Sequence, residues 1–265
     1  METMNTTENY YEPSGELTAS IMKKFLHCEN QAMAMYNGEY NQEWNDAMLI
    51  GGYVDAFVEG TLEEFKLNHP EIISSRGKTK GQLKASLRPA VKIVEKMQED
   101  TLFTSYLDGE KQKVVRGMIG GMPFKGKLDV YLKSKRIVDL KCVHDVKPSY
   151  DGTPFVKQWH YDLQLAIYQE LVFQETGERL PCYLAIAIRD DINPRFVIAE
   201  VNQHNLDEAL DEMVRVLPRV KELIEGRDTP RHCNKCKYCE ETWETRIMDS
   251  DLLGMSDYEL EMIGG

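Results

Sequence analysis

The feature that most constrains the fold is the segment PFKGKLDVYLKSKRIVDLKCVHD, which runs from residue 123 to residue 145. Apolar and polar side chains alternate through it, as they do in β-strands. The residues Lys133–Lys135 interrupt this alternation, and we interpret them as the turn of a hairpin in which Leu132 pairs with Arg136. The segment therefore predicts two antiparallel strands joined by a short turn.

Pairing along this hairpin determines which side chains meet. It places Asp129 directly opposite Asp139, and Lys127 opposite Lys141. Because successive side chains of a strand point to opposite faces, Asp129, Asp139 and Lys141 share one face. We expect the apolar residues to point to the other face, where they form a hydrophobic layer: Leu128, Val130, Val138, Leu140 and Cys142. One face is predicted to be core, and the other carries a candidate active site.

The chemistry of this polar face favours a metal site. Directly opposed side chains have Cβ atoms about 4.5–5.5 Å apart, so Asp129 and Asp139 repel each other unless a cation or a proton lies between them. A hard divalent cation such as Mg²⁺ binds one or two carboxylates and completes its shell with water and substrate phosphate oxygens. Lys141 can hold the attacking water and offset the charge of the transition state. These residues predict metal-dependent hydrolysis of a phosphodiester bond.

A segment with helical spacing follows the hairpin at residues 159–176. Within its sequence WHYDLQLAIYQE, Tyr161, Gln164 and Tyr168 share one face of the helix. Taken alone, these are packing residues of an amphipathic helix. Beside the carboxylate hairpin they become candidate members of the site.

The remaining segments complete an α/β fold. We expect a first helix that is capped by Ser14 or Thr18 and ends at Tyr36, and further helices at 47–59, 80–99 and 206–225. Strands are expected at 112–118, 123–132, 136–142, 181–189 and 195–201. The resulting architecture is a central mixed β-sheet flanked by helices.

The combination of Asp129, Asp139-Leu-Lys141 and Gln164-Leu-Ala-Ile-Tyr168 resembles the RecB-like branch of the PD-(D/E)xK nucleases, especially the phage and prophage RecE-type exonucleases (exodeoxyribonuclease VIII-like). The resemblance covers most of the chain. It implies a restriction-endonuclease-like core in which Asp129, Asp139 and the intervening Leu140 bind Mg²⁺ or Mn²⁺. It adds Gln164 and Tyr168 to the catalytic residues Asp129, Asp139 and Lys141.

The resemblance also implies a substrate and partners. The enzyme would digest linear double-stranded DNA from a 5′ end during phage-type homologous recombination, act with a single-strand annealing protein and form a homo-oligomer. Two alternatives remain open. One is an iron–sulfur single-strand nuclease of the CRISPR-adaptation type, and the other is a non-catalytic module that binds DNA ends or a protein partner.

Two positions depart from the pattern of these relatives. Many of them have a histidine at the metal site in a G-x-x-x-H motif, and here Gly51-Gly-Tyr-Val-Asp55 places an aspartate at that position. A carboxylate is also a ligand for hard cations, so Asp55 is a candidate metal ligand. Relatives often have a glutamate on the strand before the first aspartate, where Gln112 or Glu110 stands here.

The cysteines indicate a second metal site. Cys233, Cys236 and Cys239 form a C-x-x-C-x-x-C motif, which is a metal-binding pattern in a reducing compartment. The resemblance implies that Cys28 completes a clasp around a [4Fe–4S] cluster; we call these four residues the cysteine clasp. Zinc, with Cys28 or His232 as the fourth ligand, is the alternative. Two further cysteines, Cys142 and Cys182, are expected to be small buried residues.

The charge distribution leaves room for DNA binding on one face only. A net charge of −12 argues against a protein that coats nucleic acid non-specifically. Residues 75–96 are nevertheless strongly basic and form either a DNA-binding face or a solvated helix face. The candidate DNA-binding residues are Lys78, Lys80, Lys84, Arg88 and Tyr161.

The expected organisation is a nuclease domain at 1–230, a cysteine segment at 231–240 that packs back on Cys28, and an acidic tail at 241–265. We interpret the tail, including Trp243, Asp257 and Tyr258, as solubilising disorder. No run approaches the ~20 apolar residues that span a bilayer, and the N-terminus lacks the pattern of a secretion signal. We therefore expect no membrane association and a cytoplasmic location in a bacterial host, encoded by a phage or prophage.

Overall fold

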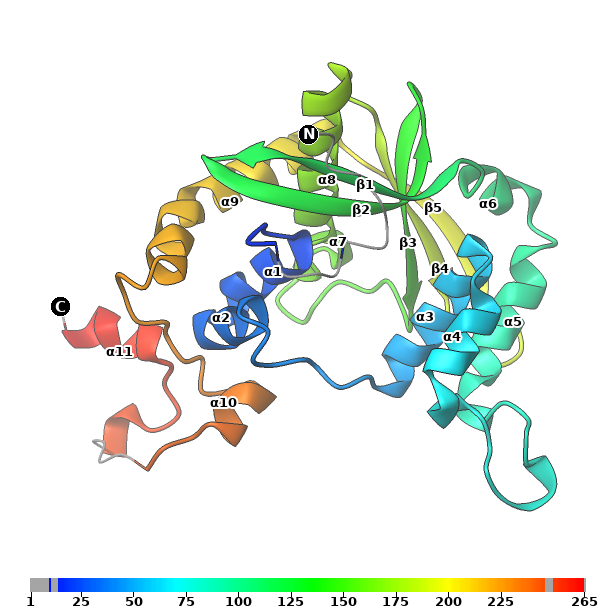
Figure 1. Ribbon diagram of the computed structural model, residues 1–265, viewed down its shortest axis with the longest axis horizontal. Helices are drawn as coiled ribbons and strands as arrows, with labels where there is room; N and C mark the ends of the chain where they lie inside the picture. Colours follow the sequence, from blue (N-terminus) through cyan, green and yellow to red (C-terminus); the bar gives the residue numbers. More distant parts are fainter. Residues whose placement is uncertain (1–9, 11–13, 246–249, 265) are drawn as a thin grey trace.

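A five-stranded mixed β-sheet forms the centre of the protein, as the computed structural model shows (Figure 1). The structure describes residue 10 and residues 14–245 and 250–264. In spatial order the strands are β1 (Glu110–Ile119), β2 (Met122–Leu132), β3 (Arg136–Val143), β4 (Cys182–Ile188) and β5 (Arg195–Val201). Neighbouring strands are antiparallel except β3 and β4, which are parallel. A helical crossover joins these two strands, as parallel pairing requires.

Helices cover both faces of this sheet, so the predicted α/β architecture is confirmed. The described α-helices are α1 (Ala19–His27), α2 (Glu29–Tyr36), α3 (Asp46–Glu59), α4 (Leu62–Asn68), α5 (Arg88–Met97), α6 (Thr101–Tyr106), α7 (Phe155–Gln158), α8 (Tyr161–Thr176), α9 (Gln203–Ile224), α10 (Lys237–Glu241) and α11 (Asp257–Gly264). On one face α1, α8 and α9 bury a large apolar cluster that includes Met22, Leu165 and Leu217. On the other face α3, α5 and α6 bury a second cluster around Val54 and Ile93.

Two predicted helices differ from the structure. The first helix, expected to end at Tyr36, is interrupted at Cys28, whose extended backbone (φ −160°, ψ 107°) ends α1 and whose thiol accepts the Gln31 N–H at the start of α2. The basic helix expected at 80–99 begins only at Arg88, because Pro89 lacks an N–H and clashes with any preceding helical turn. Residues 80–87 form turns and a short 3₁₀ segment instead.

The hairpin turn forms where the sequence predicts it, with Leu132 paired with Arg136. The β2–β3 pairing ends at Val130 and Val138, one residue before the two aspartates. The predicted pairing of Lys127 with Lys141 does not form: Lys127 pairs only with Val114 of β1, and Lys141 only with Ile186 of β4. The strands therefore diverge at the candidate site.

Strand alternation also changes at this point. Val130 and Val138 pack toward α3 as predicted, but Leu128 packs in the cluster beneath α8. Gln112 of β1, which stands opposite Asp129 in the register, has a left-handed backbone (φ 54°). Such a conformation is rare for a residue other than glycine and marks a local distortion of the strand.

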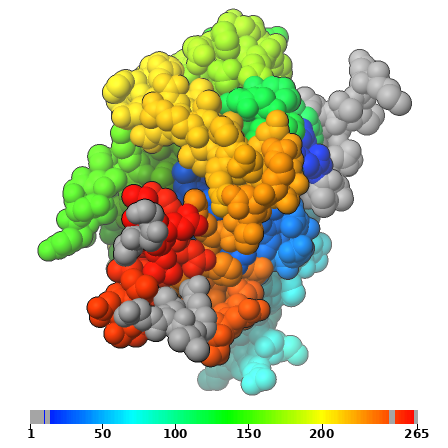
Figure 2. Space-filling view, turned by 90° about the vertical axis from the view of Figure 1, so that its left-hand side faces the viewer, coloured from blue at the N-terminus to red at the C-terminus, as the bar shows by residue number. Residues whose placement is uncertain are grey.

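The C-terminal segment is folded against the rest of the chain (Figure 2). The acidic tail was expected to be disordered, but α11 contacts the cysteine segment: the His232 N–H donates to Asp257, and Arg231 pairs with Glu261 at 2.6 Å. These contacts hold α11 beside the cysteine segment. Among the described helices, none is long and apolar enough to cross a membrane.

Candidate active site

The two aspartates and the lysine meet where β2 and β3 diverge. The Leu140 N–H donates to Asp129 Oδ2 at 2.8 Å, which joins the two strands in place of a backbone pair. Lys141 Nζ lies 2.5 Å from Asp139 Oδ2 and also donates to the Leu140 carbonyl at 3.1 Å. Asp139 is 1% exposed. The structure thus brings together Asp129, Asp139 and Lys141, which the hairpin predicted, and Leu140, which the family resemblance added.

Helix α8 supplies the next residues of the site. Gln164 Nε2 donates to Asp139 Oδ1 at 2.7 Å and lies 3.1 Å from the Tyr168 hydroxyl. The Tyr168 ring packs on Gly126 of β2, where a Cβ atom would approach the ring to 2.8 Å. Glycine at this position lets α8 come close enough for Gln164 to reach the carboxylate. Gln164 and Tyr168 therefore belong to the same cluster as the two aspartates.

A second lysine, Lys23 of α1, lies in this cluster and was missed by the sequence analysis. Its Nζ donates to Gln164 Oε1 at 2.8 Å and lies 4.9 Å from the centroid of the Tyr161 ring. Lys141 Nζ lies 5.5 Å from the same ring, so Tyr161 borders both lysines. The available sequence signal was the position of Lys23 beside Met22 and four residues after Ala19, on the apolar side of α1.

The electrostatics of the site favour an additional cation. Burial, and then the charge of Asp139, raise the pKa of Asp129 to about 7. Burial also raises the pKa of Asp55, and Asp129 adds to the effect. Burial alone would lower the pKa of Lys141, but Asp139 and Asp129 outweigh it and raise the pKa. Desolvated carboxylates whose charges repel one another are the ligands that a hard divalent cation stabilises, so these residues fit a Mg²⁺ or Mn²⁺ ion.

Two neighbouring residues border the cavity beside Asp129. Asp55 of α3, the candidate metal ligand, lines it. Gln112 lines it as well, with its Oε1 atom buried and, among the described residues, without a hydrogen-bond partner. Glu110 does not line this cavity.

The basic residues proposed for DNA binding lie elsewhere. Lys78, Lys80, Lys84 and Arg88 are exposed, and they lie on the turns before α5 and at its first residue. None of the four lines the cavity beside Asp129. Tyr161 differs from them because it borders Lys23 and Lys141 inside the cluster.

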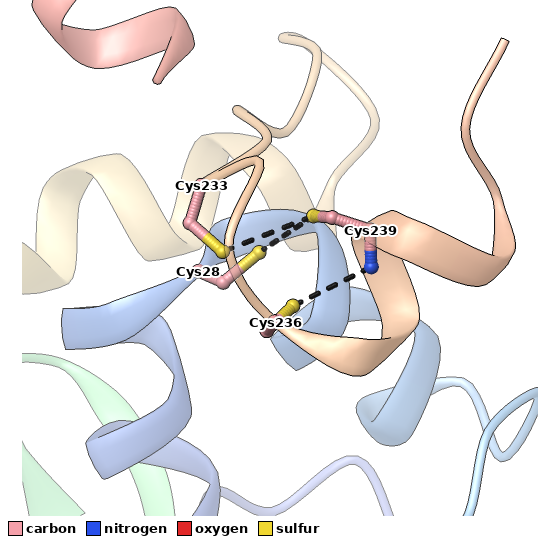
Figure 3. A group of neighbouring side chains, drawn as sticks. All are labelled: Cys28, Cys233, Cys236 and Cys239. Atoms are coloured by element: carbon pink, nitrogen blue, oxygen red, sulfur yellow. Dashed lines mark hydrogen bonds between the residues drawn. The ribbon is translucent and has the colours of Figure 1, made fainter. Parts of the chain in front are cut away.

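The cysteine clasp assembles from the two ends of the chain (Figure 3). Cys28 lies between α1 and α2, and the other three cysteines lie at the start of α10 and just before it. All four sulfurs lie within 4.8 Å of one another, with Cys28 and Cys239 at 3.5 Å and Cys233 and Cys239 at 3.9 Å. Four thiolates at this spacing can surround a metal ion. His232 is directed elsewhere, with Nδ1 3.2 Å from the Asn30 side chain. Of the two remaining cysteines, Cys182 is buried, and Cys142 is partly buried against the α3 face, as expected.

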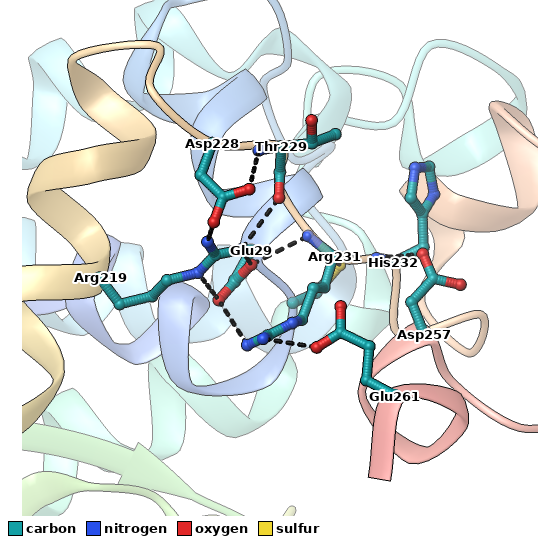
Figure 4. Close-up of polar contacts among 9 residues, drawn as sticks. Glu29, Arg219, Asp228, Thr229, Arg231, His232, Asp257 and Glu261 are labelled. Atoms are coloured by element: carbon teal, nitrogen blue, oxygen red, sulfur yellow. Dashed lines mark hydrogen bonds and ion pairs between the residues drawn. The ribbon is translucent and has the colours of Figure 1, made fainter. Parts of the chain in front are cut away.

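An ion-pair network holds the clasp segment in place (Figure 4). Glu29, the first residue of α2, accepts two hydrogen bonds from Arg219 of α9 at 3.0 and 2.9 Å and one from the Arg231 N–H at 2.9 Å. Arg219 also pairs with Asp228. The chain leaving α9 is thereby fixed beside α2 just before it reaches Cys233.

A mixed sheet flanked by helices, with Asp129 on one strand and Asp139-Leu140-Lys141 on the next, defines a PD-(D/E)xK nuclease fold. The chain belongs to the family described as PDDEXK-like domain of unknown function (DUF3799), whose model matches residues 18–242. It is 34% identical to a candidate exonuclease from Eubacterium rectale of known crystal structure. That similarity covers 93% of this chain and 96% of the other, with a TM-score of 0.86.

Other comparisons add little. The crystal structure of SSO0001 is 17% identical, with 86% of this chain and 96% of the other covered, and its TM-score of 0.36 is too low to support an argument. Among curated proteins, none matches this chain.

Proposed function

We propose that this protein is a divalent-metal-dependent DNA exonuclease that hydrolyses phosphodiester bonds at the ends of linear double-stranded DNA. The observation that carries the proposal is the cluster at the point where β2 and β3 separate, in which the Leu140 N–H donates to Asp129 and Lys141 pairs with Asp139. A non-catalytic scaffold has no use for two repelling carboxylates held beside a partly buried lysine, since charges are costly to remove from water. The similarity to the candidate exonuclease supports the choice of reaction.

Each residue of the cluster has a separate role in this proposal. Asp129, Asp139 and the Leu140 carbonyl, with Asp55 beside them, would hold the cation. When bound, the cation supplies Lewis-acid polarisation of the phosphoryl oxygens. Lys141 would orient the attacking water and stabilise charge on the phosphate, since its raised pKa keeps it protonated at neutral pH. Gln164 holds Asp139 by a hydrogen bond, which makes it a positioning residue.

The proposal also includes the biological setting of the reaction. Digestion from a 5′ end, action with a single-strand annealing protein, assembly into a homo-oligomer and a role in phage-type recombination are supported by the resemblance of the motifs to RecE-type exonucleases. A strict end-dependent enzyme must thread or grip a terminus, so it should leave circular duplex DNA intact. Substrate topology therefore separates this activity from that of a single-strand nuclease.

The test compares blunt linear duplex, single-stranded and circular DNA with Mg²⁺, with Mn²⁺ and with EDTA. We expect metal-dependent release of nucleotides from linear duplex, none from circles, and loss of activity in Asp129→Ala, Asp139→Ala and Lys141→Ala. Lys133→Ala is a matched control, because Lys133 is exposed and lies in the turn between β2 and β3, away from the carboxylates. Full activity in all three folded site variants would refute the assignment. Preference for single strands would favour the alternative nuclease.

We also propose that the cysteine clasp holds a structural metal. A single tetrahedral ion with metal–sulfur bonds of about 2.3 Å places its thiolates on the order of 4 Å apart, which agrees with the 3.5 and 3.9 Å spacings. A [4Fe–4S] cluster places four iron atoms between the sulfurs and needs them on the order of 6 Å apart. The spacing therefore favours zinc. A colourless protein with stoichiometric zinc is expected, and a brown protein absorbing near ~400 nm would identify an iron–sulfur cluster instead.

A further inference from the structure

An open cavity of about 880 Å³ lies directly beside the carboxylates. Asp129, Asp55 and Tyr168 line one part of it. Trp44 and His69, which precede α3 and follow α4, line another. The cavity is therefore continuous with the proposed metal site but extends beyond it, and its volume lies in the range that binds small molecules or single nucleotides.

An aromatic wall forms one side of this cavity. The ring centroid of His69 lies 4.5 Å from that of Trp44 and 4.4 Å from that of Phe65. A Cβ atom at Gly52 would approach Trp44 to 2.9 Å and Phe65 to 2.7 Å, so glycine is required for these rings to lie against α3. Trp44 is nevertheless 49% exposed. A large aromatic ring that is supported from behind and open in front is suited to stacking.

The charges around the cavity indicate what can stack there. The cavity is lined by four acidic residues, since Glu59 and Glu64 add to Asp129 and Asp55. Among the described residues, Lys127 is the one lysine or arginine that lines it. A run of DNA phosphates is repelled by such a lining except at the cation itself. An uncharged planar group with N–H donors is not repelled, and every nucleobase is such a group.

We propose that this cavity binds an unpaired nucleobase of the strand being cut, which stacks on Trp44 while its phosphate lies at the carboxylates. The proposal rests on the proposed nuclease function and adds a base-binding site to it. Stacking on an aromatic ring tolerates any base. The site would therefore hold the strand end without sequence preference, and it requires the terminal base pair to open.

The experiment uses the full-length protein and linear duplexes with an abasic residue at the first, second or third position of the digested strand. We expect wild-type kcat/KM to fall about 5- to 150-fold at one of these positions, the range for losing one base–aromatic stack. Trp44→Ala should lose a similar factor on intact DNA and show no further loss on the abasic duplex. Trp44→Phe should retain most of the discrimination.

Trp243→Ala is the matched control, because Trp243 is 50% exposed but lies in the C-terminal segment. It should behave as wild type. Equal wild-type cleavage of intact and abasic duplexes at all three positions overturns the proposal, whatever the folding of the variants. Discrimination that persists in Trp44→Ala also overturns it. If the wild type cleaves no DNA at all, the nuclease function fails first and the base site fails with it.

Discussion

Replacement of Asp129 by asparagine should stabilise the metal-free protein while removing its response to metal. Burial and the charge of Asp139 raise the pKa of Asp129 from the usual 3.8 to about 7. This rise in the pKa of Asp129 corresponds to at most about 4 kcal/mol of destabilisation of the folded protein at pH 8. Asp129 is partly exposed and is attracted to Lys141, so we expect about 2 kcal/mol from the substitution after solvent screening. For a chain of this size the gain raises Tm by about 4–8 °C.

The sign follows from proton linkage. The folded protein holds a proton on Asp129 that the unfolded chain has already lost, so wild-type stability falls as pH rises from about 4 to about 7. Asparagine does not titrate, and the advantage of Asp129→Asn should therefore be full at pH 8 and nearly absent at pH 4. Asp139→Asn should instead destabilise the protein. It removes the partner of Lys141 at 2.5 Å, and breaking such a buried pair costs about 3 kcal/mol.

Thermal unfolding in EDTA at pH 4, 6 and 8, followed by titration with Mg²⁺, measures both effects. Mg²⁺ should raise the Tm of wild type, because a ligand that binds only the folded state stabilises it, and should leave Asp129→Asn unchanged. The reasoning is refuted if Asp129→Asn is less stable than wild type at pH 8 in EDTA, or if the two asparagine variants shift Tm in the same direction.

Three further predictions concern the surroundings of this site. Lys23→Met should lower kcat about 10- to 100-fold with little change in KM, because it leaves Gln164 Oε1 without its hydrogen-bond donor at a cost of about 1–3 kcal/mol. Partial rescue of kcat by Lys23→Arg in steady-state kinetics would distinguish a positioning role of Lys23 from general destabilisation of the protein. Cys236→Ser should lower the metal content and the Tm, whereas Cys142→Ser, outside the clasp, should leave the metal content unchanged by elemental analysis. Glu29→Gln should weaken both arginine contacts and speed limited proteolysis of residues 225–245, and an unchanged cleavage rate would show that the network is not needed there.

The hairpin could be predicted because the residues that determine it lie close together in the sequence. Alternation, a short turn and two acids at equal distances from that turn are enough to bring Asp129 and Asp139 to adjacent positions. Alternation alone could not reveal that the strands diverge at this point. Gln112 of β1, opposite Asp129, has a positive φ at the same point, and a glutamine carries no sequence signal for such a conformation.

Residues that reach the site from distant segments were harder to predict. Gln164 and Asp55 were found through a motif resemblance. Lys23 was missed, because nothing in its own segment shows that α1 packs beside α8. The basic run before α5 shows a different limit: Pro89 delays the helix, and the four candidate residues are exposed but do not line the cavity beside the carboxylates, so a DNA-binding face there stays a prediction. The density of charge in a segment does not show where that segment lies relative to the active site.

Helix α1 connects the two proposed metal centres. Lys23 in its middle holds Gln164, which holds Asp139, and Cys28 at its end belongs to the clasp. The backbone turns sharply at Cys28, so the direction of α1 depends on what fixes that residue. Metal bound by the clasp would fix it, and the position of Lys23 would follow. Stripping the clasp metal should then weaken Mg²⁺ binding, measured calorimetrically, in wild type but not in Lys23→Met. Equal weakening in both proteins would show that the two centres communicate by another route or through loss of the fold.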